Sequence, residues 1–361
     1  MDNLVAVIMA GGKGERFWPR SRGLYPKQLL PITGRRTMIQ ETAKRMNPLI
    51  SSDDIFVVAG EELAGGIGEQ LPELRRGNLI LEPFGKNTAA AIGLAAIVIE
   101  KINKKAIMVV LAADHLIGEK RKFLRTISMA TKAAKEGKLV TLGIQPTRPE
   151  TGYGYIESGK KLQISGVRKE AEIYAVKRFV EKPDEAGAKK YLQSGKYFWN
   201  SGMFIWKVES ILGAIEEHMP ELHRGLKKIS AARGVSHKKE VIKKVYKKLE
   251  NISIDYGIVE KSKNIAVVKA DFHWDDVGSW LSMERIHKKN KDGNIIQGKF
   301  VGIDTSQCIL IGKEQLIATV GVSGLIVVTT PQAVLICSRD RAQDVKKIVG
   351  KLADDGLKKY L

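Results

Sequence analysis

A glycine-rich stretch with several cations near the N-terminus is the strongest chemical signal in this sequence. Residues 9–32 read MAGGKGERFWPRSRGLYPKQLLPI and follow the apolar run LVAVI, which is typical of a buried strand. Glycines allow backbone N–H groups to approach an anion closely, and Arg16 and Lys27 can neutralise its charge. Three prolines discourage a helix here. The pattern predicts a phosphate-binding loop at the carboxyl end of the first strand, where open α/β sheets bind ligands.

This loop matches neither of the two common phosphate-binding motifs. A Walker loop needs Ser or Thr after its lysine, where this sequence has Gly14. A dinucleotide-binding fingerprint needs a third glycine where Phe17 stands. A tight turn without a ligand is the alternative. Against it, Arg16 and Lys27 have no carboxylate near them in the sequence except Glu15, so we expect neither to form a surface ion pair.

Alternating strand-like and helix-like segments must position this loop. Apolar runs such as LVAVIMA, DIFVVAG, AIMVVLAAD and LVTLGI alternate with helical patterns such as TMIQETAKRM and FLRTISMATKAAKEG up to about residue 285. Near-continuous apolar runs are typical of strands covered on both faces. The alternation therefore predicts a Rossmann-like α/β fold, with a mixed, largely parallel sheet and helices on both faces.

The pattern changes after about residue 290. FVGID, QCILIG, LIATV, LIVVTT and AVLICS follow one another at spacings of about eight to ten residues with no helical pattern between them. We predict a small all-β module here, a sandwich or a β-helix-like solenoid, closed by a terminal helix. The predicted domains are residues 1–288 and 294–361.

The composition describes a soluble globular chain with a basic excess. The chain has 361 residues, of which 43% are hydrophobic, and a formal net charge of +20. Such a charge suggests polyanionic partners, but most of the excess lies in HRGLKKISAARGVSHKKEVIKKVYKKLE, which is typical of helices with one solvated face. No aromatic stacking pattern accompanies it, so we expect no nucleic-acid partner.

Neither the cysteines nor the apolar segments point to export or to a membrane. Cys308 and Cys337 lie inside apolar runs, which predicts two buried, reduced thiols in a cytoplasmic protein. The N-terminal apolar run is too short for a signal peptide. The alanine-rich segment TAAAIGLAAIVIEKI reads as a buried helix.

Motifs along nearly the whole chain resemble those of the sugar-nucleotide pyrophosphorylases. The opening loop is similar to their signature, and EPFGKNTAAAI, AADHLI, TGYGYIE, FVEKP, WNSGMF, SIDYGIVEKS and WDDVGSW stand in the family's order. FWPRSR and PKQ resemble in particular the mannose-1-phosphate guanylyltransferases. The resemblance implies a nucleotide-diphospho-sugar transferase fold. It also implies that GMP is transferred from GTP to α-D-mannose 1-phosphate, which releases pyrophosphate.

The resemblance assigns Arg16 and Lys27 to phosphate binding and transition-state stabilisation. It assigns Asp114 and Asp276 to a divalent metal, with Mg²⁺ expected, because Mg²⁺ takes few protein carboxylates together with substrate phosphate oxygens. Both residues would otherwise be read as turn aspartates. The choice of Asp276 over Asp275 rests on the family pattern, since the spacing alone does not decide it.

For the nucleotide, the resemblance implies contacts from Ala10, Gly11, Gly12, Glu82, Asn87 and Thr88. Guanine presents two N–H donors beside one acceptor, so its pocket needs acceptors. Glu82 is a candidate, although Pro83 and loop carbonyls would serve equally. Asn87 and Thr88 also suit the N-cap of a helix.

For the sugar phosphate, the resemblance implies a pocket made of Gly154, Glu181, Lys182, Asn200 and Asp255. Glu181 would bind hydroxyls and Lys182 the phosphate, while Asn200 can both donate and accept. An exposed turn is the alternative for the FVEKP segment. The identity of the hexose comes from the resemblance only.

Rival functions remain open at this point. Another base or hexose is the nearest alternative, and a glycosyltransferase or a catalytically inactive nucleic-acid-binding protein is more distant. The chain lacks the D-x-D motif typical of glycosyltransferases. Some relatives carry an appended isomerase domain; because this chain ends at Leu361, we expect no isomerase activity.

The closing helix carries an apolar stripe that consists of Val345, Ile348, Val349 and Leu352. The stripe needs a partner, and docking on its own chain is the alternative to a second subunit. The resemblance favours a homodimer held together by the C-terminal module. We expect residues after about 290 to contribute no catalytic atom.

Overall fold

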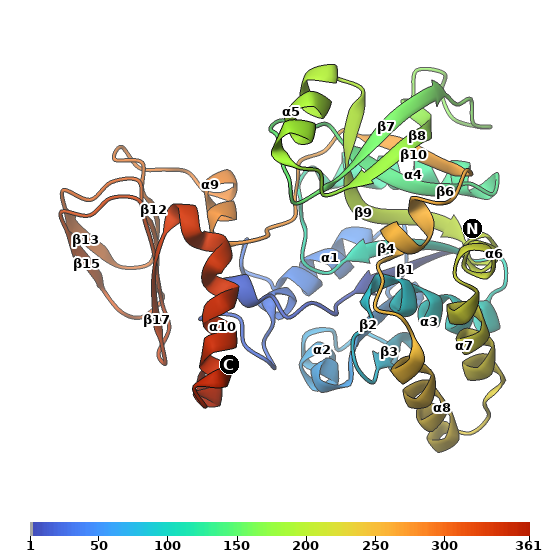
Figure 1. Ribbon diagram of the computed structural model, residues 1–361, viewed down its shortest axis with the longest axis horizontal. Coiled ribbons are helices and arrows are strands. Elements are labelled where there is room, and N and C mark those ends of the chain that lie inside the picture. The colour runs from blue at the N-terminus through green and yellow to red at the C-terminus, as the bar shows by residue number, and fades with distance from the viewer. Residues whose placement is uncertain (1–2) are drawn as a thin grey trace.

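A nine-stranded mixed sheet forms the centre of the larger part of the molecule (Figure 1). The computed structural model describes residues 3–361. The strand order is β3-β2-β1-β4-β9-β6-β10-β8-β7. The strands are β1 (Leu4–Met9), β2 (Ile55–Gly60), β3 (Leu79–Glu82), β4 (Ile107–Ala112), β6 (Leu139–Ile144), β7 (Gly154–Lys161), β8 (Ile173–Glu181), β9 (Tyr197–Lys207) and β10 (Ile265–Ala270).

One half of this sheet is entirely parallel, and the other half mixes parallel and antiparallel ladders. The strands β3, β2, β1 and β4 run parallel, and so do β6 and β10. The long strand β9 lies antiparallel to β4, β6 and β7, and it joins the two halves. The carboxyl ends of β1 and β4 therefore lie at one edge of the sheet, where the glycine loop follows β1.

Helices cover both faces, as the sequence predicts. One face carries α1 (Met38–Met46), α2 (Ala64–Gln70), α4 (Lys120–Lys135) and α5 (Glu185–Ser194), and the other carries α3 (Asn87–Ile102), α6 (Val208–His218), α7 (Pro220–Ala231) and α8 (Val235–Lys248). Strand β1 shows why both faces are apolar: Leu4, Ala6 and Ile8 enter one core, and Val5 and Val7 enter the other.

The lysine-rich segment forms α7 and α8, and its charges face solvent. Leu222, Leu226, Ile229 and Val245 are buried, while most of the lysines on these two helices are exposed. Across residues 3–361, no helix is long and apolar enough to cross a bilayer.

The C-terminal module is β-helix-like, as predicted. Parallel strands β12 (Ile295–Gln297), β14 (Ile309–Ile311) and β16 (Leu325–Thr329) stack beside one another, with β17 (Val334–Ser338) antiparallel at the end. Strands β13 (Phe300–Ile303) and β15 (Ile317–Val320) form a second parallel pair. The domain boundary between residues 288 and 294 stays a prediction.

The module docks on its own chain through a shared apolar core. Phe17, Trp18 and Trp280 from the α/β part pack with Ile309 and Val345 from the module. The terminal helix α10 (Val345–Asp354) contacts the short 3₁₀ turn η1 (Glu15–Phe17). The apolar stripe of α10 is thus covered mainly by its own chain, which was the alternative to a second subunit.

The two cysteines differ in burial. Cys308 is buried and Cys337 is only partly buried, and both are free. The prediction of two buried thiols is therefore wrong for Cys337, because β17 is an edge strand of its sheet.

Candidate active site

The glycine loop is fixed by contacts with the segment that contains the PKQ motif. Gln28 donates through Nε2 to the carbonyl oxygens of Ala10 and Gly12, at 2.7 and 2.9 Å. Gly14 has φ +63°, and a Cβ there would lie 2.5 Å from Cβ of Lys27. Only glycine allows Lys27 to pack so closely against the loop.

Lys27 is buried at the centre of the site. Its ammonium group lies 2.8 Å from Asp114 Oδ2 and donates to the carbonyl oxygens of Asp276 and Val277, each at 2.8 Å. The residue is only 4% exposed, so Lys27 forms no surface ion pair, as expected, but a buried one that the sequence did not predict. The reason is tertiary: the carboxylate that pairs with Lys27 comes from the end of β4.

The charge of Lys27 also determines the state of Asp114. Burial alone would raise the pKa of this carboxyl, but the positive charge and hydrogen bond of Lys27 bring it below its usual value. Asp114 is therefore ionised in the folded protein.

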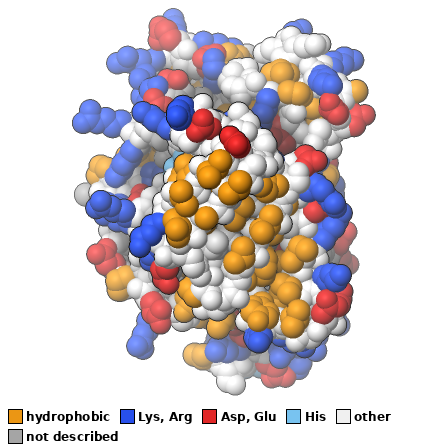
Figure 2. All heavy atoms as spheres, turned by 90° about the vertical axis from the view of Figure 1, so that its left-hand side faces the viewer, with side chains coloured by type: hydrophobic (Ala, Val, Ile, Leu, Met, Phe, Trp, Pro, Cys, Tyr) orange, Lys and Arg blue, Asp and Glu red, His pale blue; other side chains and the backbone are white. Residues whose placement is uncertain are grey.

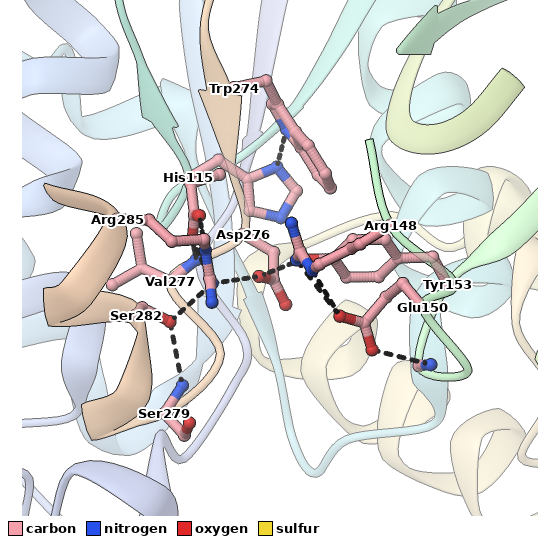
Figure 3. A network of polar contacts seen from close by, with 12 residues as sticks. His115, Arg148, Glu150, Tyr153, Trp274, Asp276, Val277, Ser279, Ser282 and Arg285 are labelled. Carbon is pink, nitrogen blue, oxygen red and sulfur yellow. Dashed lines mark hydrogen bonds and ion pairs between the residues drawn. The ribbon is translucent and has the colours of Figure 1, made fainter. Parts of the chain in front are cut away.

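A polar network surrounds Asp276 (Figure 3). The Tyr153 hydroxyl donates to Asp276 Oδ1 at 2.5 Å. Burial, followed by the charge of Asp276, raises the pKa of Tyr153, so this hydroxyl stays protonated. Arg285 Nη2 lies 3.9 Å from the same carboxylate oxygen. Asp276 is thus oriented from two sides and has its second oxygen available.

Asp275 has a different, structural environment. It is buried and forms a two-point ion pair with Arg285, with Oδ1 lying 2.9 Å from Nη2. Its Oδ1 also accepts from the backbone N–H of Val277 at 2.8 Å. Val277 has φ +48°, which is unfavourable for a β-branched residue, and its carbonyl oxygen accepts from Lys27. Asp275 therefore positions an acceptor of Lys27.

These groups line a cavity of about 430 Å³. Its lining consists of Lys13, Gly14, Glu15, Arg16, Phe17, Lys27, Asp114, His115, Asp276, Gly278 and Lys346. Arg16 Nε is buried and has no hydrogen-bond partner within the described chain. A buried donor without an acceptor is costly, and a phosphate oxygen would satisfy it.

The carboxylates of this cavity fit a hard divalent cation. Asp114 and Asp276 each have one oxygen engaged by a side chain, and both side chains are partly exposed to the cavity. Residues 3–361 contain no cluster of three or more His, Cys, Asp or Glu side chains arranged to hold a metal. Two carboxylates suit an ion such as Mg²⁺ that is completed by substrate phosphates and water.

Glu82 lies beside the glycine loop at the end of β3. A Cβ on Gly11 would be 4.0 Å from Glu82 Oε2, and Oε1 is buried without a hydrogen-bond partner in the described part of the chain. Burial raises the pKa of Glu82 to about 7, with Tyr246 opposing and Glu62 adding to the shift. A carboxylate with an unpaired, buried oxygen fits the acceptor that guanine requires.

The cap position of α3 is Lys86, one residue before the expected pair, and its own side chain forms no cap hydrogen bond. Asn87 Oδ1 nevertheless accepts from the backbone N–H of Thr88 at 2.9 Å, in the first turn of the helix. Asn87 has φ +65°, and Thr88 Oγ1 accepts from the backbone N–H of Ile254 at 2.8 Å. Thr88 thus ties α3 to the SIDYG segment, and Asn87 is exposed.

The five residues of the expected sugar pocket come together. Asn200 Nδ2 donates to Asp255 Oδ1 at 2.8 Å, and Lys182 Nζ lies 3.3 Å from Glu181 Oε1. Gly154 pairs with Glu181 across β7 and β8, and a Cβ on it would lie 2.3 Å from Glu181 Oε2. That oxygen is buried and has no partner within residues 3–361. Burial and the charge of Asp255 raise the pKa of Glu181.

Comparison with known proteins finds relatives along nearly the whole chain. A nucleotidyl transferase family model matches residues 5–293, and a model of the mannoseP isomerase/GMP-like β-helix domain matches residues 298–352. The chain is 40% identical over 360 residues to a mannose-1-phosphate guanylyltransferase from Klebsiella pneumoniae, across 99% of this chain and 75% of that protein. It is 42% identical over 353 residues to one from Salmonella montevideo, across 97% and 74%.

The chain belongs to the mannose-1-phosphate guanylyltransferase family. A solved structure from Thermus thermophilus, of a protein named mannose-1-phosphate geranyltransferase, is also similar. Its TM-score is 0.86 at 34% identity, over 97% of this chain and 99% of that one. The whole architecture, including the β-helix-like module, is therefore shared with a solved relative.

Sequence reasoning missed several residues that shape this guanylyltransferase-family site. They are Gln28, His115, Tyr153, Arg285 and Lys346. Gln28, His115 and Tyr153 stand inside the motifs PKQ, AADHLI and TGYGYIE, which was a usable signal. Trp274 Nε1 donates to Nδ1 of His115 at 3.2 Å, which leaves the proton on Nε2. Burial lowers the pKa of His115, so its ring is neutral. Arg285 and Lys346 had no sequence signal.

Proposed function

We propose that this protein transfers GMP from GTP to α-D-mannose 1-phosphate, forming GDP-mannose and pyrophosphate. The observation that carries the proposal is the order of these groups across the sheet. Glu82 ends β3 and offers a base acceptor, Glu181 ends β8 and offers a hydroxyl acceptor, and β1 and β4, which lead to the glycine loop and to Asp114, lie between those strands. This order matches base, phosphates and sugar in the product.

In this mechanism, a phosphate oxygen of the sugar phosphate attacks the α-phosphorus of GTP in line with the leaving pyrophosphate. Both reactants are polyanions, so the site must reduce their repulsion and stabilise the charged transition state. We assign this to Arg16 and Lys27. Lys27 is held in place by its three contacts before substrate binds, and the buried Nε of Arg16 is left for a phosphate oxygen. A bound divalent ion, with Mg²⁺ expected on Asp114 and Asp276, would supply further charge neutralisation.

Selection of base and sugar is assigned to the two flanking pockets. Ala10, Gly11 and Gly12 would let the backbone lie against the nucleotide, with Glu82 accepting from guanine. On the sugar side, Tyr153 links Asp276 to the pocket that begins at Gly154, so the attacking phosphate would lie next to the metal site. Glu181, Asn200 and Asp255 would bind hydroxyls.

We infer in addition that the protein forms a homodimer through its C-terminal module. Six apolar side chains of this module each expose 53–69% of their surface: Val301, Ile303, Leu316, Val320, Val334 and Ile336. Figure 2 shows apolar side chains gathered on this side of the molecule. Ile303 and Val320 are paired neighbours on β13 and β15, so they form one continuous surface. Exposed apolar patches and open strand edges of this kind favour a second copy as the partner.

The free thiols of Cys308 and Cys337 favour the cytoplasm as the compartment of the protein.

One assay tests the catalytic proposal. Pyrophosphate release is measured with four nucleoside triphosphates, several hexose 1-phosphates, and Mg²⁺ present or chelated. We expect turnover with GTP and mannose 1-phosphate only when the metal is present. A preference for another base or hexose would favour the alternative, a different sugar-1-phosphate nucleotidylyltransferase. A folded sample with no turnover that binds neither GTP nor GDP-mannose would overturn the proposal.

A further inference from the structure

The C-terminal helix brings a cation to the phosphate cavity. Lys346, in the first turn of α10, lines the same cavity as Arg16, Lys27, Asp114 and Asp276. Our prediction that residues after about 290 contribute no catalytic atom did not anticipate that one of them lines this cavity. The sequence separation is large, so only the docking of the module on the α/β part creates this arrangement (Figure 1).

The docking of α10 is rigid at the point that carries Lys346. The preceding residue, Val345, is 2% exposed and packs in the cluster that contains Phe17 and Trp280. Phe17 belongs to the same 3₁₀ turn as Arg16, and its ring centroid lies 4.9 Å from that of Trp280. Trp18 Nε1 donates to the carbonyl oxygen of Tyr360 at 2.9 Å. Lys346 and Arg16 are therefore held on two segments that pack directly against each other.

Lys346 also differs from its neighbours in being free of a partner. Lys347 lies 2.7 Å from an oxygen of Asp344, and Arg341 lies 2.8 Å from the other oxygen of the same carboxylate. Within residues 3–361, Lys346 forms no ion pair or hydrogen bond. In this cavity Lys27 is paired with Asp114, and Lys13 lies 4.0 Å from Glu15. The cations left without a carboxylate in the described structure are Arg16 and Lys346.

We propose that Lys346 binds the β- and γ-phosphates of the nucleotide, which leave as pyrophosphate. Two unpaired cations beside each other repel, and a polyanion between them would remove that repulsion. The sugar pocket adjoins Asp276 through Tyr153, whereas Lys346 lies on the helix that packs against the turn of Arg16. The leaving group is therefore the part of the substrate nearest to Lys346. This inference rests on the proposed function, and it makes the β-helix-like module part of the phosphate site.

The test compares Lys346→Ala and Lys346→Arg with Lys347→Ala as the matched control. Lys347 lies on the same helix and is also exposed, but it pairs with Asp344. Calorimetry measures the dissociation constants of inorganic pyrophosphate and of GDP-mannose, each with Mg²⁺, and kinetics give KM for GTP. Melting curves check that each variant is folded.

We expect Lys346→Ala to weaken pyrophosphate binding and raise KM for GTP by about tenfold or more, the effect of losing one charged contact. GDP-mannose lacks the leaving group, so its dissociation constant should not change. Lys346→Arg should retain most of the affinity, and Lys347→Ala should behave like the unmodified protein. The inference is overturned if the two alanine variants bind pyrophosphate equally, if GDP-mannose binding falls as much as pyrophosphate binding, or if the unmodified protein does not bind pyrophosphate. Lack of turnover with every nucleotide, with pyrophosphate binding still dependent on Lys346, would count against the proposed function alone.

Discussion

The ammonium group of Lys27 lies 2.8 Å from a carboxylate oxygen of Asp114, although the two residues come from segments far apart in the sequence. With two carbonyl oxygens also accepting, all three N–H donors of Lys27 are used before any substrate binds. The charge that would stabilise the transition state is thus preorganised, and its position depends on the loop between Asp275 and Val277.

Lys27→Ala and Arg16→Ala should each lower kcat by about 10²-fold or more, the scale of losing one preorganised charge. Arg35→Ala is the control, because that side chain follows the loop closely, is exposed and does not line the cavity. Steady-state kinetics check the result. A change in KM with kcat unchanged would instead indicate that the lost interaction is equally strong in the ground state.

Lys27→Ala should also lower the melting temperature, in contrast to Arg16→Ala. Lys27→Ala leaves the Asp114 carboxylate without its buried cation, and such a loss lowers the free energy of unfolding by about 3 kcal/mol in comparable sites. The folded-state pKa of Asp114 is lowered, so its stabilising effect is present above the unfolded value of 3.8 and is lost as pH falls through the lower folded value. The difference in stability between the unmodified protein and Lys27→Ala should therefore shrink at strongly acidic pH. Equal melting temperatures of these two proteins at pH 7 would contradict the prediction.

Asp276→Asn and Asp275→Asn should have opposite dominant effects. The first should raise the concentration of Mg²⁺ needed for half-maximal turnover, with little change in melting temperature. The second should mainly lower the melting temperature, because Arg285 loses its buried two-point ion pair. Metal titrations and melting curves of both variants check this. The reverse ranking in the metal titration would show that Asp275 is the metal ligand.

Binding of GDP-mannose should strengthen as pH rises from 6 to 8. Glu82 has a pKa of about 7 in the folded protein, and only the carboxylate can accept from both N–H groups of guanine. Glu82→Gln should flatten this dependence, whereas the exposed neighbour Glu62→Gln should not. Isothermal titration at several pH values provides the measurement. An unchanged pH profile in Glu82→Gln would remove Glu82 from the guanine pocket.

Glu82 should also make the stability of the folded protein depend on pH. The folded-state pKa of Glu82 is about 7, above its unfolded value of 4.5. Protonated Glu82 therefore contributes its full stabilisation below pH 4.5, and this contribution is lost as pH rises through about 7. Ionising this buried group costs about 3 kcal/mol. Glu82→Gln should therefore raise the melting temperature more at pH 8 than at pH 5.

Gly154→Ala should impair sugar-phosphate binding while leaving the nucleotide in place. The added Cβ would lie 2.3 Å from Glu181 Oε2 and 3.0 Å from Phe179 Cζ, so the carboxylate must move. We expect KM for mannose 1-phosphate to rise about tenfold or more, the effect of losing one charged hydrogen bond. Glu181→Gln, which keeps the shape, measures the part due to charge. A larger effect on GTP than on the sugar phosphate would contradict the assignment.

Ile303→Lys with Val320→Lys should convert the proposed dimer into a monomer. Both side chains are exposed on paired strands, and two charges there would have to be desolvated at an interface. These substitutions are a sharper test than removing the module, which would expose Phe17, Trp18 and Trp280. Light scattering gives the mass, and turnover checks the fold. A double variant of unchanged mass would exclude this face as the interface.

The amino-acid sequence was sufficient to predict the architecture, and its motifs named residues that the structure brings close together. Periodicity predicted the α/β sheet, because strands with two covered faces must be apolar throughout, as in LVAVIM. The eight-to-ten-residue spacing predicted a small all-β module, either a sandwich or a β-helix-like solenoid, and the structure shows the second. Motif order indicated the family and named the residues that the structure then gathers into two neighbouring clusters, such as Asn200 with Asp255.

Tertiary structure alone decided which charges pair and which remain free. Lys27 looks like an exposed loop cation in the sequence, yet it is buried against Asp114, because ion pairs form between residues that the sheet brings together. Asp275 and Asp276 are neighbours of the same type, but one faces Arg285 and the other faces the cavity. Lys346 and Lys347 are equally alike in sequence. Their difference arises because packing of Val345 fixes the rotation of α10, which leaves one lysine beside Asp344 and turns the other toward the phosphate cavity.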